Sequence, residues 1–424
     1  MNLRKIIPLF SIIMLSLCAV FVACGLSKGS QDPWAMYRGP LSSGIASSAP
    51  SLKLWNEGQS PTMLWKRPLK DAFSGLTLSG NMIITGFGED STEFLGAFSR
   101  QSGEELWRYK MNSIFVEEFG NGPRATPAID GQRAYMFDSW GVMHGIDLTT
   151  GEGLWINDLA GTFFLKSAQG RGFCASPVLL DGVLIQYVSG LDSTAFMGLD
   201  PATGKILWRK GSAFPTFSSP TLTELCGEKQ AIFSSGRVMM VDGQRRGKYE
   251  TISLNAKGET LWTAPGLPGI ITMPVRLDNN KVFVASQLNY GSLALTVSKD
   301  EEGYKVEEAW KSRNMQTHFN NAVYYNGHIY GFNNATLECL STEDGKRMWR
   351  KRGLGKGSLI VVGDKLLALS DKGGLFVVAA TPDEYKELAS FQALEGKSWT
   401  SPTFADGKLY VRNLEEMACY DLTK

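Results

Sequence analysis

The stretch Asp200-Pro201-Ala202-Thr203-Gly204-Lys205-Ile206-Leu207-Trp208-Arg209 decides the fold. It combines a turn that ends in glycine, a tryptophan four residues after that glycine, and a basic residue next to the tryptophan. The same interval returns at four other places: Gly103 to Trp107, Gly151 to Trp155, Gly258 to Trp262 and Gly345 to Trp349. Five copies with one unchanged interval indicate an internal repeat, which has to be understood before any functional site is considered.

The unit that contains this stretch predicts four short strands joined by tight turns. Asp181-Gly182 is a hairpin signal, because an Asp-Gly pair readily adopts the positive φ angles of a type I′ turn. Gly204 ends a second turn in the left-handed conformation that glycine tolerates best. Because such a unit recurs roughly every 40 to 50 residues and no long stretch has helical periodicity, the sequence predicts the blades of a β-propeller. In this unit the strands are expected over residues 175–180, 183–189, 195–200 and 205–210.

The number of blades follows from the tryptophans that align on the fourth strand, the last of which is Trp349. Two further units come after Trp349. One is residues 358–391, where Leu388-Ala389 takes the Leu-Trp position, and the other is residues 398–422, which stop after a third strand. Near residue 63 there is a fourth strand without the three before it. Joining the partial units gives an all-β, eight-bladed propeller of four-stranded antiparallel blades over residues 63–424, with the N-terminal strand closing the ring and removing the open sheet edges. The tryptophans expected to dock on neighbouring blades are Trp65, Trp107, Trp155, Trp208, Trp262, Trp310 and Trp349.

Each docking tryptophan is expected to fill the wedge between two blades and to donate its indole N–H to a backbone carbonyl. The blade that ends at Ala389 has no such tryptophan, so it is where we would look for a blade loosened for a partner.

One position of the third strand, called the small slot, holds a small residue in the aligned units. Cysteines at this position are expected to be buried apolar groups, and no Cys339 to Cys419 bridge is predicted. The oxidation state of Cys174 and Cys226 stays open. The small slot holds Ala97, Gly145, Gly198, Ser253, Cys339 and Cys419.

The first residues predict export. Arg4 and Lys5 precede a mostly apolar run that ends at Cys24, so residues 1–23 are interpreted as a lipoprotein signal peptide and Cys24 as the lipidated residue. An uncleaved anchor helix is the alternative, since the run is just long enough to span a bilayer.

The organisation that follows is a polar tether over residues 24–33 and an N-terminal extension packed on the propeller over residues 34–62. The expected location is the cell envelope, with a lipid anchor in the outer membrane and the domain facing the periplasm. Gly25, directly after the cysteine, is typical of outer-membrane lipoproteins. The sequence alone does not decide between the inner and the outer membrane.

Charge does not point to a polyanionic partner. Lysine and arginine number 43 against 42 aspartates and glutamates, so no nucleic-acid-binding surface is predicted. The expected partners are envelope proteins and, through the lipid anchor, the membrane. The closed ring is expected to be monomeric.

The stretch from Asp200 to Arg209 resembles the tryptophan-docking repeat of the PQQ-like β-propellers, where PQQ is pyrroloquinoline quinone. The resemblance covers about residues 34–424, and Trp34-Ala35-Met36-Tyr37-Arg38-Gly39-Pro40 is similar to an opening of many secreted members. The family includes PQQ-dependent alcohol dehydrogenases and the lipoprotein assembly factor of the outer-membrane β-barrel assembly machinery. The resemblance therefore implies the fold, and one propeller hosts unrelated functions.

The residues argue against a quinone enzyme. Alcohol dehydrogenases of the family carry two adjacent cysteines over the quinone, and this sequence has neither adjacent cysteines nor a Cys-x-x-Cys-His haem motif. No catalytic, cofactor-binding or metal residues are therefore predicted; PQQ with calcium belongs to the alternative, since glucose-type quinoproteins lack the cysteine pair. His144 and His328 are interpreted as packing residues, and no two histidines have the spacing of a metal site.

One candidate ligand site remains, in the loops that precede the first strands. First strands line the axis of a propeller, and the loops before them open on one face. An arginine, aromatic and amide set at this mouth suits an oligosaccharide, a peptide or a small anion, although a mouth without a ligand is the alternative. The candidate residues are Arg124, Arg171, Phe173, Phe217, His318, Asn320 and Trp399.

The expected function is that of a non-catalytic cell-envelope lipoprotein whose propeller is a protein-interaction scaffold, with the β-barrel assembly machinery as the expected setting. A PQQ-dependent alcohol or sugar dehydrogenase is the first alternative, and a carbohydrate-binding propeller is the second. The sequence does not name the partner or the ligand.

Overall fold

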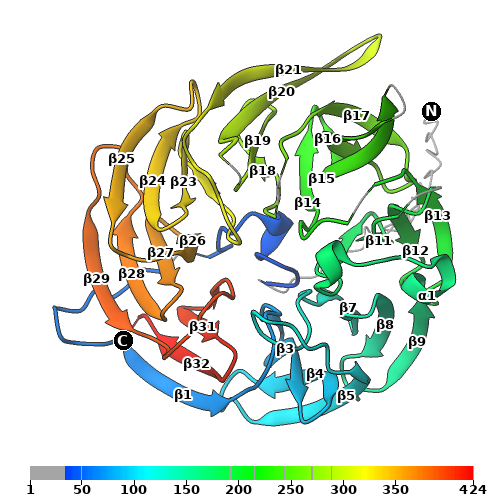
Figure 1. Cartoon of the computed structure of the whole chain (residues 1–424). Helices are drawn as coiled ribbons and strands as arrows, with labels where there is room; N and C mark the ends of the chain where they lie inside the picture. The colour runs from blue at the N-terminus through cyan, green and yellow to red at the C-terminus, as the bar shows by residue number, and fades with distance from the viewer. Residues whose placement is uncertain are drawn as a thin grey trace, which may run out of the picture.

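The computed structural model describes residues 34–48, 50–190, 193–213, 215–241, 244–268, 271–287 and 289–423, and only the backbone for residues 237–241 and 244–246. Eight four-stranded antiparallel sheets surround one axis, which confirms the predicted eight-bladed propeller (Figure 1). The signal peptide, Cys24 and the tether lie outside the described residues. No helix in the described ranges is both long enough and apolar enough to cross a membrane.

The blades follow the chain in order. The first two are β2 (Thr77–Ser79), β3 (Met82–Glu89), β4 (Thr92–Ser99), β5 (Glu105–Ser113) and β6 (Ala128–Asp130), β7 (Arg133–Phe137), β8 (Val142–Asp147), β9 (Gly153–Asp158). The third and fourth are β10 (Val178–Leu180), β11 (Val183–Tyr187), β12 (Phe196–Leu199), β13 (Ile206–Lys210) and β14 (Thr221–Leu225), β15 (Glu228–Val241), β16 (Gln244–Leu254), β17 (Thr260–Pro265). The fifth and sixth are β18 (Val275–Arg276), β19 (Lys281–Ala285), β20 (Ser292–Asp300), β21 (Gly303–Ser312) and β22 (Val323–Tyr325), β23 (His328–Asn333), β24 (Thr336–Ser341), β25 (Arg347–Arg352). The seventh is β26 (Gly357–Val362), β27 (Lys365–Ser370), β28 (Gly374–Ala379), β29 (Glu387–Gln392).

The eighth blade joins the two ends of the chain. It consists of β30 (Thr403–Ala405), β31 (Lys408–Arg412), β32 (Glu416–Asp421) and β1 (Thr62–Pro68), and β1 pairs antiparallel with β32 so that Trp65 lies opposite Cys419. The predicted closure of the ring is therefore confirmed. It leaves β1 as the outer strand of the last blade, beside the C-terminus (Figure 1).

The innermost strands are shorter than the sequence predicts. β10 begins at Val178, because the backbone N–H of Ser176 donates to the Ser219 hydroxyl of the next blade at 2.9 Å instead of joining a ladder. The same contact links Thr126 to Ser176 at 2.9 Å and Gly75 to Thr126 at 2.8 Å. The repeated Ser/Thr-Pro pairs thus supply hydroxyl acceptors that connect successive blades around the axis.

The glycine of each repeat serves the tryptophan of the preceding blade. Gly258, with φ of 76°, lies under the Trp208 ring, where a Cβ would overlap the indole. The indole N–H of Trp208 then donates to the carbonyl of Ala256 in the same turn at 2.8 Å. Six of the seven aligned tryptophans donate in this way at 2.7–3.1 Å, to the carbonyls of Arg100, Leu148, Pro201, Ala256, Thr342 and Thr381.

Trp262 departs from this pattern. Its indole N–H donates at 2.7 Å to the side-chain oxygen of Gln230 within its own blade. The neighbouring blade has the long β20–β21 hairpin, and the glycine of its turn, Gly303, has no tryptophan next to it. This tryptophan is buried all the same, so a side-chain acceptor replaces the missing carbonyl.

The small slot has a steric cause. Each slot residue lies directly opposite a tryptophan on the fourth strand, as Gly198 does opposite Trp208 and Cys339 opposite Trp349. A Cβ at Gly198 would overlap the Trp208 indole. Cys339 and Cys419 are free thiols whose pKa values burial raises to about 12, which fits inert packing groups.

The blade without a docking tryptophan is compensated rather than loosened. Val377 occupies the slot opposite Ala389, so the large and small residues have exchanged strands. Trp55 of the N-terminal extension covers this blade from outside: its ring packs edge-on against Phe391 at 5.3 Å, and its N–H donates to the Ser390 carbonyl at 3.0 Å.

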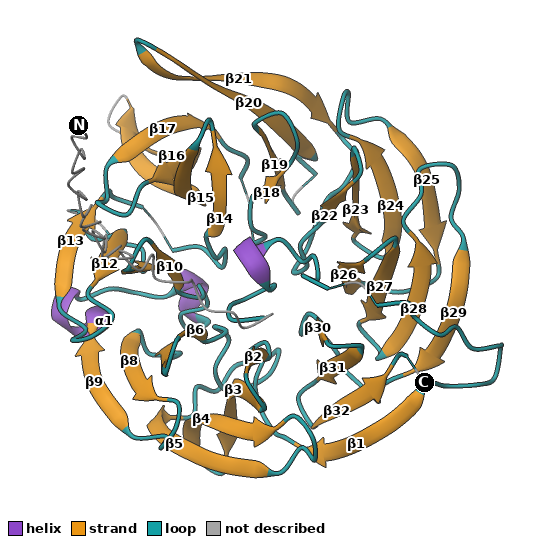
Figure 2. Cartoon of the chain, turned by 180° about the vertical axis from the view of Figure 1, so that it is seen from behind, coloured by secondary structure: helices purple, strands orange, loops and turns teal. Residues whose placement is uncertain are grey.

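The start of the extension lies on the propeller axis, where Figure 2 shows the short helix η1 (Pro40–Ser42) at the centre of the ring. Trp34 and Ala35 accept backbone bonds from Leu78 and Ile129 in the first two blades at 2.9 and 2.8 Å. Further along, η1 contacts β14 of the fourth blade, and Ile45 forms a parallel bridge with Val361 of the seventh blade. Residues 34–46, called the axial segment below, therefore cross the bore.

Arg38 fixes the axial segment. Its buried guanidinium donates to the carbonyls of Ala322 at 3.1 Å and Leu359 at 3.4 Å, and to the Ser401 hydroxyl at 3.5 Å. Burial lowers the pKa of Arg38 to about 10, and no carboxylate contacts it in the described part of the chain. One side chain thus joins three neighbouring blades to the axis.

Candidate functional site

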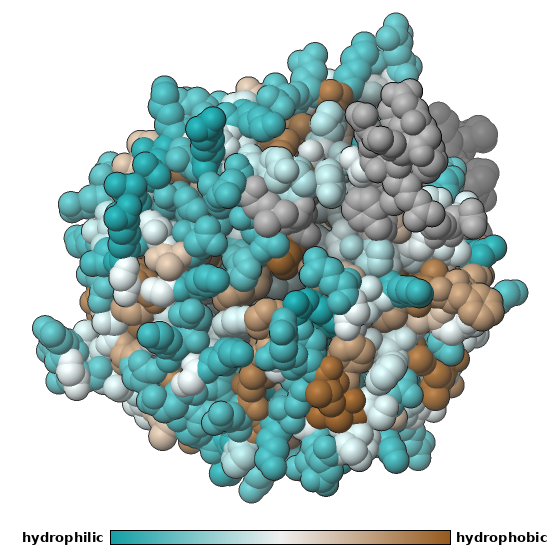
Figure 3. All heavy atoms as spheres, in the orientation of Figure 1, coloured by the Kyte–Doolittle hydropathy of each residue, from teal (hydrophilic) through white to brown (hydrophobic). Residues whose placement is uncertain are grey.

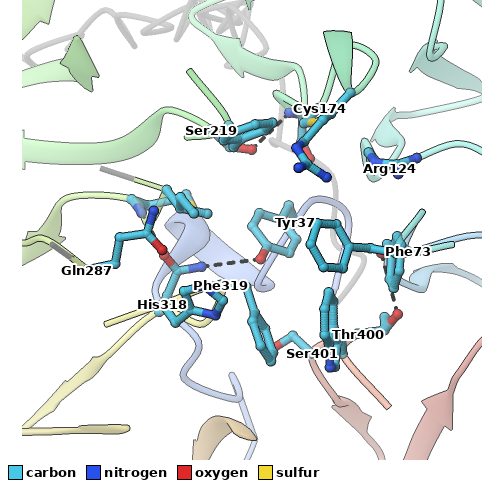
Figure 4. A pocket seen from close by; sticks show the side chains of 18 of the residues that line it. Tyr37, Phe73, Arg124, Cys174, Ser219, Gln287, His318, Phe319, Thr400 and Ser401 are labelled. Atoms are coloured by element: carbon cyan, nitrogen blue, oxygen red, sulfur yellow. Dashed lines mark hydrogen bonds between the residues drawn. The ribbon is translucent and has the colours of Figure 1, made fainter. Parts of the chain in front are cut away.

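The mouth of the propeller is a blind cavity. The first strands of the blades begin at this face, and the loops before them surround a cavity of about 370 Å³ (Figure 4). Tyr37 of the axial segment lies among the lining residues, and Asn321 donates to its hydroxyl at 3.2 Å. Burial raises the pKa of Tyr37, so the phenol stays protonated at neutral pH. The axial segment therefore forms the floor.

Five of the seven predicted mouth residues line this cavity: Arg124, Arg171, Phe217, His318 and Trp399. Phe173 and Asn320 do not. Phe173 packs edge-on against Phe137 at 5.4 Å, and Asn320 is buried. Cys174 and Asn321, one position further along, line the cavity in their place.

Both arginines are already paired with acidic side chains. Glu117, from the loop between β5 and β6, binds Arg124 at 3.0 Å and also pairs with Arg171. Arg171 further binds Glu118 at 2.8 Å. Glu117 has no counterpart in other repeats, so the repeat pattern gave no signal for it. The pairing cancels much of the positive charge expected from the two arginines.

Aromatic side chains fill one side of the mouth. Trp399 stacks on Phe319 with ring centres 4.4 Å apart and on Phe73 at 5.5 Å, and Phe119 lies 5.8 Å away. The four residues come from the first, sixth and eighth blades and from the β5–β6 loop. We call Phe73, Phe119, Phe319 and Trp399 the aromatic cluster.

Two lysines border the aromatic cluster. The ammonium of Lys356 lies 6.0 Å from the Phe319 ring centre, and that of Lys397 lies 5.0 Å from the Trp399 ring centre. Lys356 also contacts Nδ1 of His318 at 3.5 Å. Burial, and secondarily the Lys356 charge, lowers the pKa of His318, so the imidazole is neutral at pH 7 and accepts from the lysine.

Cys174 is the cysteine at the mouth, and it is not an activated nucleophile. Burial raises its pKa to about 12, and its thiol donates to the Gly172 carbonyl at 3.4 Å. A reactive cysteine needs a lowered pKa. The thiol therefore acts as a small lining group.

Exposed apolar side chains continue outward from the aromatic cluster. Val116 and Trp140 are 74% and 45% exposed, and Phe164, which follows α1 (Leu159–Phe163), is 90% exposed. In Figure 3, apolar residues gather on this face over the blades of β5 and β9. We call Val116, Phe119, Trp140 and Phe164 the apolar rim.

A buried carboxylate holds the loops of this rim. Glu93 accepts backbone bonds at 3.3 Å from Phe115 and from Ser139, one on each oxygen. Burial, helped by the nearby Asp138, raises the pKa of Glu93 to about 7. The loops that carry Glu117 and Trp140 therefore share one support.

The raised pKa of Glu93 predicts a pH dependence of stability. In the folded state the carboxyl keeps its proton up to about pH 7, whereas its ordinary pKa is 4.5. The stability that proton binding provides is therefore full below pH 4.5 and is lost as the pH rises to 7. Relative to Glu93→Gln, we expect wild type to lose about 2 kcal/mol between pH 5 and pH 7. Urea unfolding of both proteins at each pH measures this difference, and parallel profiles would show that Glu93 titrates normally.

The residues at the mouth do not fit a PQQ and calcium pair. Calcium requires several oxygen ligands, but among the described lining residues Glu117 is the one carboxylate, and two arginines occupy it. No group of three acidic, histidine or cysteine residues within the described ranges is placed to hold a metal ion. The planar surface that a quinone would need is also taken, because Trp399 packs on Phe319 and Phe73.

Comparisons with known proteins agree on the architecture. A family model described as outer membrane protein assembly factor BamB matches residues 91–351. No curated protein matches the sequence.

The solved structures that resemble the chain include a BamB and two quinohemoprotein alcohol dehydrogenases. BamB from Moraxella catarrhalis gives a TM-score of 0.60 at 13% identity, covering 86% of this chain and 98% of that one. The quinohemoprotein alcohol dehydrogenase from Comamonas testosteroni gives a TM-score of 0.62 at 10% identity, covering 92% and 81%. The quinohemoprotein alcohol dehydrogenase from Pseudomonas putida HK5 gives a TM-score of 0.59 at 12% identity, covering 93% and 80%. At such identities the likeness shows a common fold, and the fold alone.

Proposed function

The chain belongs to the family of the outer membrane protein assembly factor BamB, and on that premise we propose that it is a non-catalytic interaction scaffold of the cell envelope. The observation that carries the proposal is the mouth, a concave aromatic site that continues into the apolar rim. Exposed apolar and aromatic side chains beside a pocket are typical of protein-binding surfaces. Its partner would be an envelope protein, in the setting of outer-membrane protein assembly.

The proposal includes the location. A lipid on Cys24 would hold the propeller at the outer membrane, facing the periplasm. The order of signal, tether and extension in the sequence supports this arrangement. Globomycin, which blocks lipoprotein signal cleavage, should make the larger precursor accumulate, and Cys24→Ser should release the protein from membranes. Membrane retention of Cys24→Ser would contradict the lipid anchor.

The proposal also includes the absence of a quinone cofactor. Two features of the mouth support it: the carboxylate is already paired with two arginines, and the aromatic rings already pack on one another. Titration of the purified protein with PQQ and calcium should give no bound-quinone spectrum and no dye reduction with alcohols or sugars. A bound quinone with dye reduction would establish the dehydrogenase instead.

In-cell crosslinking tests the scaffold itself. A photoreactive amino acid at Phe164 or Val116, both exposed on the apolar rim, should crosslink to a β-barrel assembly component. The matched control is the same group at Leu207, which is exposed on the outer strand β13. Equal products from rim and control positions would contradict a partner surface at the rim.

A further inference from the structure

Two cations at the edge of the mouth have no acidic partner in the part of the chain that the structure describes. Lys356 and Lys397 border the aromatic cluster, and neither contacts a carboxylate within the described residues. Lys397 donates to the carbonyl of Phe119 at 2.9 Å, and Lys356 donates to neutral His318. Both lysines are thus aimed at uncharged groups beside the cavity, where a ligand carboxylate would be their first ionic partner.

The arginines limit which anion fits. Arg124 and Arg171 have the planar, two-pronged donors that suit phosphate, but Glu117 engages both. Among the mouth residues that the structure describes, the cations without an acidic partner are lysines, which act as point charges and lack the two-pronged geometry of arginine. This described part of the mouth therefore offers no free two-pronged donor for a phosphate, and its apolar lining suits a carboxylate that is attached to an apolar body.

The surroundings require an apolar body next to that carboxylate. The lining includes Phe217, Ile271 and Met273 besides the aromatic cluster. The cavity is too small for a folded domain but of the size that accepts a few side chains. It also opens onto the apolar rim through Phe119, so that a ligand longer than the cavity meets a further apolar surface.

We propose that the mouth binds an extended peptide segment in which an acidic residue, paired with Lys356 beside His318, adjoins an aromatic or aliphatic residue packed on the aromatic cluster. The segment would run outward over the apolar rim. This inference rests on the proposed function, because it names the chemistry of the partner that a scaffold would engage. It assigns the ionic contact to a lysine rather than to the arginines, because Glu117 already engages both arginines.

Two fluorescent peptides test the proposal on the purified full-length lipid-free chain. One alternates phenylalanine and aspartate, and the other replaces each aspartate by asparagine. Fluorescence anisotropy at low salt should show at least tenfold tighter binding of the acidic peptide. Lys356→Gln should weaken that binding about tenfold, whereas Lys205→Gln, on an exposed turn of the opposite face, should not change it. Thermal melts of both variants check that they fold.

Each other outcome has a definite meaning. Equal affinity for the two peptides, no binding of either, or an unchanged affinity in Lys356→Gln overturns the inference. Binding of phosphatidylglycerol vesicles or chitin oligosaccharides, but not of the acidic peptide, overturns it in favour of a lipid surface or a carbohydrate. If the rim crosslinks to an envelope protein equally well in Lys356→Gln, the scaffold function stands and only the peptide site fails. If the acidic peptide binds but no envelope protein crosslinks, the scaffold function fails instead.

Discussion

Replacement of Trp310 by alanine is expected to destabilise the propeller by about 3 to 5 kcal/mol, the usual cost of deleting a buried tryptophan. Trp310 is buried and lies against Gly345 of the next blade. Its indole N–H donates to the Thr342 carbonyl at 2.8 Å, and that carbonyl would lose its partner. The substitution thus opens a cavity at a junction between two blades and removes a hydrogen bond across it.

Urea unfolding followed by tryptophan fluorescence measures the change. Leu207→Ala is the matched control, because Leu207 is apolar but 53% exposed on an outer strand, and we expect it to change stability by less than about 1 kcal/mol. A loss of the same size in both variants would mean that the outer strands, rather than the indole contacts, carry the effect.

Substitution of valine for Gly198 is expected to cost about 3 kcal/mol or more, through overpacking. Gly198 lies opposite Trp208, and even a Cβ there would overlap the indole. The ring would have to leave the wedge between the third and fourth blades, and its bond to the Ala256 carbonyl would break. The displaced ring and the broken hydrogen bond both belong to the contact between Trp208 and the fourth blade, so the effect is local to that junction.

The double variant Gly198→Val with Trp208→Ala should be more stable than the sum of the two single losses predicts. The seventh blade shows why, since it has Val377 opposite Ala389 in the corresponding positions. We expect a favourable coupling of about 1 to 2 kcal/mol, measured by a double-mutant cycle in urea. Strict additivity would show that valine in the slot cannot replace the indole in this blade.

The sequence predicts the fold because every blade repeats the same steric problem. A glycine and a small slot recur with each tryptophan because the indole ring needs the space that they leave. Their spacing therefore reveals the blades and the closure of the ring by β1 and β32. The ends of the first strands were harder to predict. Their backbone N–H groups donate to hydroxyl groups of the next blade. The residues of the strand alone do not determine where that blade lies.

The mouth could be predicted only in part. The loops before the first strands were located correctly, but Phe173 and Asn320 turn into the core while their neighbours Cys174 and Asn321 face the cavity. A shift of one residue reverses the face, and only the packing of adjacent blades fixes it. Glu117 lies in a loop that no other blade repeats, so a comparison among repeats has no counterpart to align with it.

Other contributors arise from segments that lie outside the repeat. Tyr37 reaches the cavity because the axial segment crosses the bore, and Lys356 belongs to a connection between blades. The Trp34 to Pro40 motif indicated a packed extension, but nothing in those residues specifies the axis as its place. That position results from contacts with blades far apart in the sequence.

The axial segment also decides how the molecule would respond to mechanical force. Attached directly to β1, a tether would pull on the end of an outer strand and could unzip it from β32 one hydrogen bond at a time. Tension arriving upstream of Trp34 instead meets the centre of the ring, where Arg38 and the bridge to Val361 hold the segment. The load is thereby spread over several blades at once, and the seam that closes the propeller is shielded from it.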